Sequence, residues 1–62
     1  MKHYEAWYKI FDDRDYIQLV YFGNRKMECL QAARDASLEH GGIPVTIMES
    51  GKNGSKQWTV KA

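Results

Sequence analysis

Side chains that act as nucleophiles or soft metal ligands are scarce in this sequence. Cys29 is the single cysteine, and His3 and His40 are the two histidines. Cys29 and His40 are far from the i,i+4 spacing that places two ligands on one face of a helix. A lone cysteine excludes both an intrachain disulfide and a two-cysteine metal clamp, and a thiol buried in a helix is inert. The sequence therefore predicts no metal, no cofactor and no cysteine–histidine catalysis.

Carboxylates are more frequent, but their spacing does not predict acid–base catalysis. Residues 12–15 (Asp-Asp-Arg-Asp) place three carboxylates in one predicted turn, where they would suit a hard cation. The EF-hand pattern requires alternating acidic positions, a central glycine and a distal glutamate, so we interpret the run as a solvated turn. Glu28, Asp35 and Glu39 fall on the predicted wet side of a helix, where no cleft would hold a substrate. We therefore expect a protein that is not an enzyme.

Aromatic residues are concentrated near the start of the sequence. Seven of the eight aromatic side chains lie within the first 22 positions, and on strands they would point to both faces. The seven are Tyr4, Trp7, Tyr8, Phe11, Tyr16, Tyr21 and Phe22, and the eighth is Trp58. Because the sequence predicts one helix, one face of a sheet built from these residues is expected to lie open. An open aromatic face favours a binding partner, since aromatic side chains dominate binding hot spots.

Strand patterns occupy both ends of the sequence. Residues 4–11 and 16–22 alternate at period two and are rich in strand-favouring types, which predicts two strands. The short charged connection between them predicts a hairpin. Residues 43–49 and 56–61 predict two further strands around a turn at 50–55, whose Asn-Gly pair suits positive backbone angles.

The residues between the two strand pairs predict a single helix over 25–40. Asn24 is the best N-cap candidate, and Gly41-Gly42 followed by Pro44 predicts the end of the helix. The alanines would allow the helix to approach a sheet closely. The expected apolar side comprises Met27, Leu30, Ala33, Ser37 and Leu38, with Cys29 and Ala36 at its margin.

These elements predict one α+β domain over residues 1–62 with the order ββαββ. The simplest architecture is a four-stranded, mostly antiparallel sheet with one helix packed on one face. The strand order stays open, because the helix can cross over one strand or two. Strict alternation assigns to the helix side Ala6, Tyr8, Ile10, Ile17, Leu19, Tyr21, Val45, Ile47, Trp58 and Val60. The opposite face then carries Trp7, Lys9, Phe11, Gln18, Val20, Thr46, Met48 and Lys61.

The face opposite the helix carries the main candidate binding residues. Trp7 and Phe11 are the expected apolar anchors, Lys9 would steer a partner, and Met48 adds an apolar contact. We expect a small non-enzymatic adaptor or inhibitor that binds a protein partner or a second copy of itself as a homodimer. The alternative is single-stranded nucleic acid, because rings can stack on bases while lysines approach phosphates. A third interpretation is that the rings cover one another in cross-strand pairs and bind nothing.

The predicted start of the helix is a second candidate site. Arg25 and Lys26, after Asn24, place two cations at the positive end of the helix dipole, which costs roughly 0.3–1 kcal/mol. A bound phosphate or an acidic partner would reverse the sign of this effect. The alternative is that both cations extend into water, with Arg25 paired to Glu28. The signature of a phosphate-binding loop, which ends in Gly-Lys-Ser/Thr, is missing here.

Composition places the chain among globular proteins. Hydrophobic residues make up 44% and charged residues 27% of the sequence, which argues against disorder. The net charge of +1 excludes a global field for nucleic acid or a membrane surface. No apolar run approaches the length of a membrane span, no secretory signal is recognisable, and a small domain without disulfides fits a reducing cytosol. We therefore expect a cytoplasmic protein without membrane contact.

Overall fold

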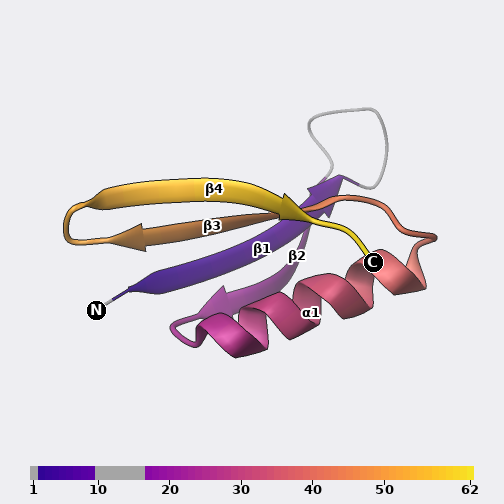
Figure 1. Cartoon of the computed structure of the whole chain (residues 1–62), viewed down its shortest axis with the longest axis horizontal. Coiled ribbons are helices and arrows are strands. Elements are labelled where there is room, and N and C mark those ends of the chain that lie inside the picture. The colour runs from indigo at the N-terminus through magenta and orange to yellow at the C-terminus, as the bar shows by residue number, and fades with distance from the viewer. Residues whose placement is uncertain (1, 10–16) are drawn as a thin grey trace.

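The computed structural model describes residues 2–9 and 17–62, whose elements follow in the order ββαββ (Figure 1). The elements are β1 His3–Lys9, β2 Ile17–Gly23, α1 Lys26–Glu39, β3 Val45–Gly51 and β4 Gly54–Val60. The predicted α+β class and element order are confirmed. The third strand begins at Val45 rather than at residue 43. The predictions for Ile10, Phe11, Tyr16 and the acidic turn at 12–15 lie outside the described residues.

The four strands form one sheet in the order β2-β1-β3-β4, and each of its three strand pairs is antiparallel. β1 and β3 are therefore central, and β2 and β4 are the edges. β2 and β3 run parallel to each other on either side of β1, and α1 connects them across one face of the sheet (Figure 1). The sequence left the strand order open, and the structure shows that the connection through α1 crosses one strand, β1.

The hairpin of β3 and β4 is tighter than the sequence predicts. We expect a turn from 50 to 55, but the ladder continues to the pair Gly51–Gly54, so only Lys52 and Asn53 form the turn. Gly54 adopts a φ of +129°, a backbone region that other residue types rarely occupy. This glycine therefore allows the two strands to extend to the end of the hairpin.

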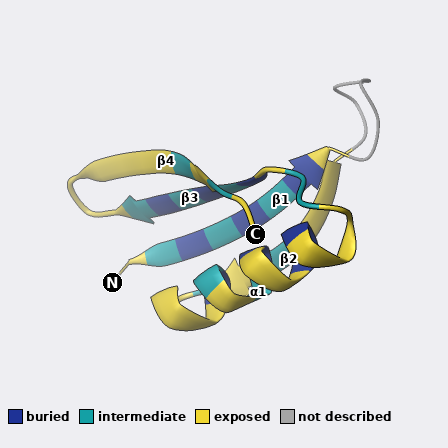
Figure 2. Cartoon of the chain, turned by 45° about the vertical axis from the view of Figure 1, so that its right-hand side comes forward, coloured by how far each residue is buried: buried dark blue, intermediate teal, exposed yellow. Residues whose placement is uncertain are grey.

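The hydrophobic core lies between α1 and one face of the sheet. Figure 2 shows buried residues on β1, on β3 and on the inner side of α1. The helix contributes small side chains, and the central strands contribute larger ones, so tyrosine rings fill the space that short helical side chains leave. The buried residues of the sheet include Tyr4, Ala6, Tyr8, Val45 and Ile47, and those of the helix are Cys29, Ala33, Ala36 and Ser37.

The buried stripe of α1 differs from the predicted apolar side. The sequence places Met27 and Leu38 on that side, but these residues are 76% and 72% exposed. Cys29 and Ala36, which the sequence places at the margin, are buried instead. The helix contacts the sheet through its small residues, so an apolar side chain beside this narrow stripe has no second layer to pack against.

The two ends of α1 are satisfied in different ways. Arg25 occupies the N-cap position without a capping side-chain bond, so the prediction of Asn24 as the N-cap is wrong. The backbone N–H of Arg25 instead donates to the hydroxyl of Tyr21 at 3.3 Å, because β2 brings that side chain to the start of the helix. At the other end Gly41 and Gly42 have φ values of +80° and +86°, which confirms the predicted glycine stop.

A β-bulge in β2 changes which side chains share a face. Tyr21 lies opposite Ala6 and Leu19 lies opposite Trp7, so Val20 is an extra residue in the ladder. The assignment of Ile17 and Leu19 to the helix side is therefore wrong, because the bulge moves both to the opposite face. For the same reason Val20, predicted on the open face, packs against the core instead. Gln18 changes face as well, since it pairs with the buried Tyr8.

Ser37 connects three segments at the far end of the helix. Its buried hydroxyl donates to the carbonyl of Ile43 at 2.5 Å and accepts the backbone N–H of Ala62 at 3.0 Å. Ser37→Ala is expected to lower the free energy of unfolding by about 1–3 kcal/mol, because the buried hydroxyl and its two hydrogen bonds are lost together. Urea unfolding of the variant measures this loss. Ser55→Ala, at an exposed position of β4, is the control, and equal effects of the two changes would contradict this role.

Candidate interaction surface

The face of the sheet opposite α1, here called the open face, is defined by the strand register. Leu19, Trp7, Thr46 and Thr59 form one cross-strand row. The next row runs across Phe22, Glu5, Met48 and Gln57. Ile17 pairs with Lys9 on one side of these rows, and His3 pairs with Ser50 on the other. The only helix within residues 2–9 and 17–62 lies on the other side of the sheet.

The apolar part of the open face is concentrated on β2 and on the strand next to it. Ile17, Leu19 and Phe22 are 56%, 50% and 65% exposed. Trp7 and Met48 are half-buried beside them. β4 contributes only polar side chains to this face, among them Gln57 and Thr59. The side chains of β2, with Trp7 of β1 and Met48 of β3, thus form the apolar half of the open face, and β4 forms its polar half. The charged residues Glu5 and Lys9 of β1 lie beside the apolar half.

The structure brings together three of the four predicted partner-binding residues. Trp7, Lys9 and Met48 lie on the open face, and Phe11 is outside the described residues. Sequence reasoning missed Ile17 and Leu19, because strict alternation cannot detect a bulge. The only signal in the sequence is that β2 contains apolar residues at successive positions, a pattern without a clear period of two.

Among the described residues, contacts within the chain cover only part of the open face. The rings of His3 and Phe22 meet edge to face, with centroids 4.3 Å apart and an interplanar angle of 71°. This contact is the kind of cross-strand cover that the third interpretation requires. Phe22 nevertheless remains 65% exposed. Ring-to-ring packing within the chain therefore does not remove this side of the sheet from water.

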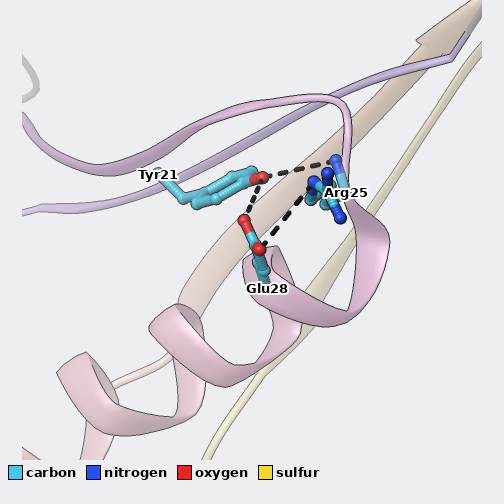
Figure 3. A network of polar contacts seen from close by, with 3 residues as sticks. All are labelled: Tyr21, Arg25 and Glu28. Carbon is cyan, nitrogen blue, oxygen red and sulfur yellow. Dashed lines mark hydrogen bonds and ion pairs between the residues drawn. The ribbon is translucent and has the colours of Figure 1, made fainter.

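The start of α1 carries a small polar network (Figure 3). The hydroxyl of Tyr21 donates to Glu28 Oε1 at 3.3 Å, and Arg25 Nε lies 3.9 Å from Glu28 Oε2. The ammonium of Lys26 lies 5.9 Å from the centroid of the ring of Trp58, which is on β4. Arg25 is thus paired with Glu28 as the alternative interpretation expects. The two cations have different neighbours, and an anion site at Asn24, Arg25 and Lys26 stays a prediction.

A charged pocket that the sequence did not predict lies beside the β3–β4 hairpin. Lys2, Glu49, Lys52 and Lys56 line it together with the turn, and it encloses about 420 Å³. Lys2 Nζ lies 3.1 Å from Glu49 Oε2, and Glu49 is only 8% exposed. The hydrogen bond from Lys2, aided by the charges of Lys2, Lys26 and Lys56, holds the pKa of Glu49 below its usual value. The same bond raises the pKa of Lys2.

The lowered pKa of Glu49 gives stability a definite pH dependence. A carboxylate whose pKa is lower in the folded state stabilises the protein above its unfolded value of 4.5, and this contribution disappears as pH falls through the folded value. Glu49→Gln is expected to flatten the fall in stability below that pH. Thermal unfolding between neutral pH and acid measures it, and Lys2→Met is expected to give the same flattening. An unchanged acid limb in both variants would show that the pair contributes nothing.

Cys29 and His40, the other candidate chemical groups, both contact the core. Cys29 is fully buried, and this burial raises the pKa of its thiol, which keeps it protonated. His40 shares a hydrogen bond of 2.9 Å with the hydroxyl of the core residue Tyr8. In residues 2–9 and 17–62, no three His, Cys, Asp or Glu side chains are grouped as metal ligands. The same ranges hold no helix with the length and apolar character needed to cross a membrane.

Comparison with protein-family models, curated proteins and solved structures gave no match to this chain.

Proposed function

We propose that this chain is a non-enzymatic interaction module, an adaptor or an inhibitor, that binds a protein surface through the open face of its sheet. One observation carries the proposal. Ile17, Leu19 and Phe22 are each at least half exposed, and they lie beside Trp7 on the side of the sheet that α1 does not cover. A contiguous apolar patch on a small protein is typical of a contact surface.

The chemistry of the open face favours a protein over nucleic acid. Aliphatic side chains such as Ile17 and Leu19 fill pockets in protein surfaces, but they offer no flat ring on which a base can stack. Nucleic-acid binding also requires several cations near the phosphates. Of the paired strand residues on this face, Lys9 is a cation and Glu5 is an anion, so their charges cancel. A partner with an apolar surface fits this face better than a polyanion.

Sedimentation of the pure protein tests the proposal. The measurement uses two protein concentrations and two salt concentrations, with and without a short single-stranded oligonucleotide. We expect association that grows with protein concentration, changes little with salt and does not involve the oligonucleotide. Oligonucleotide binding that weakens steeply with salt would assign the face to nucleic acid instead. A monomer under every condition would exclude a second copy as the protein partner.

A further inference from the structure

The two edges of the sheet differ in how they are protected from other strands. Natural sheets block exposed edges with lysine and other charged residues, with proline or with a β-bulge. β2 has a bulge at Val20. β4 carries Lys56 and is followed by Lys61, whereas β2 (Ile-Gln-Leu-Val-Tyr-Phe-Gly) has neither a charge nor a proline. Its exposed side chains are mostly apolar. β2 is thus the edge at which another strand meets no electrostatic barrier.

The bulge in β2 determines which self-pairing matches its faces. Two copies of one strand are related by a two-fold axis only when they pair antiparallel. With the axis between Val20 and Tyr21, Leu19 lies opposite the partner's Phe22 on the open face. Val20 then lies opposite the partner's Tyr21 on the helix side. Moving the pairing by one residue places Leu19 opposite Tyr21 or Gly23 and removes the apolar pair. Of these three registers, only the one centred between Val20 and Tyr21 matches both faces, and it pairs more of the apolar residues than larger shifts along β2 do.

We propose that a second copy of this chain pairs along β2 in this register, joining two four-stranded sheets into one of eight strands. The inference goes beyond the proposed function, because it concerns the edge of the sheet and does not require the open face to be filled. No charged side chains oppose each other along the paired strands. Two symmetric contacts between Leu19 and Phe22 extend the apolar half of each open face into one stripe across the dimer. Tyr21, whose hydroxyl bonds to Glu28 and to the backbone N–H of Arg25, presents its ring on the helix side.

Disulfide formation between two single-cysteine substitutions tests this register. Residues that face each other on antiparallel strands are close enough for a disulfide. Leu19→Cys chains mixed with Phe22→Cys chains are expected to give a covalent dimer as the main product of mild oxidation. Either variant alone is expected to give little, because identical positions would lie about 10 Å apart along the strands. Mass spectrometry of the peptides identifies the link and shows that buried Cys29 takes no part.

A matched control separates edge pairing from other modes of association. The control mixes Gln57→Cys chains with Leu19→Cys chains. Gln57 lies on the open face too, but on β4, at the other edge of the sheet. This mixture is expected to give little covalent dimer under the same oxidation. Equal yields from this control and from the Leu19–Phe22 mixture would overturn the proposal. So would equal yields from the single variants, a monomeric wild-type protein in sedimentation, or an open-ended series of larger species, which head-to-tail pairing of β2 with β4 would produce. None of these outcomes, by itself, removes the open face as a surface for a different protein.

Discussion

Replacing Trp7 by alanine is expected to weaken binding at the open face about 30-fold, while the fold remains intact. Trp7 is half-buried in the middle of the apolar half, with Leu19 on one side and Thr46 on the other. An aromatic anchor at the centre of an interface contributes about 2 kcal/mol or more to binding, which corresponds to this loss of affinity. Its contribution to folding comes from cross-strand pairs, which are worth about 0.2–1 kcal/mol each.

Sedimentation equilibrium and urea unfolding of the same variant measure the two effects. Both are measured in otherwise unchanged chains, because Leu19 and Phe22 belong to the open face, and association beyond the edge-paired dimer reports that face. Trp58→Ala is the matched control. Trp58 pairs with Ile47 on the helix side and packs against the core, so its loss is expected to cost about 2 kcal/mol or more of stability. A large loss of stability in Trp7→Ala, with association unchanged, would place Trp7 in the role of a core residue.

Replacing Ile47 by alanine is expected to lower the free energy of unfolding by about 2–5 kcal/mol, since it leaves a cavity in the core. Ile47 is fully buried on a central strand, between Ala6 on β1 and Trp58 on β4. Folded proteins have a net stability of about 5–15 kcal/mol, and a domain of this size lies near the lower end. The melting temperature is therefore expected to fall by about 10 °C or more, as calorimetry or circular dichroism would measure.

Ile17→Ala is the matched control for this change, because it removes the same atoms from the other face of the sheet. Ile17 is 56% exposed, so the loss is expected to stay below about 1 kcal/mol. This comparison also tests the bulge at Val20. Without the bulge, Ile17 would face the helix as strict alternation predicts. Replacing either isoleucine by alanine would then lower the free energy of unfolding by a similar amount. Equal losses would therefore contradict the register of β2.

Local patterns in the sequence were sufficient for the order of the elements and for several of their boundaries. The change from period two to period 3.6 predicts ββαββ, and Gly41-Gly42 stops the helix where predicted. Trp7 faces away from α1 because it alternates with Ala6 and Tyr8 within one uninterrupted strand. Each of these features depends on residues that are close in sequence, so local sequence patterns are sufficient to predict it.

Tertiary structure alone decided the strand order and the composition of the open face. Both depend on pairing between segments that are distant in sequence, and one extra residue in a ladder reverses every side chain beyond it. The bulge at Val20 therefore moved Ile17 and Leu19 out of the core, and the run of successive apolar residues in β2 is a signal too weak to locate it. The exposure of Met27 and Leu38 has a similar cause. The apolar character of a helical residue is local, but whether it is buried depends on where the sheet ends.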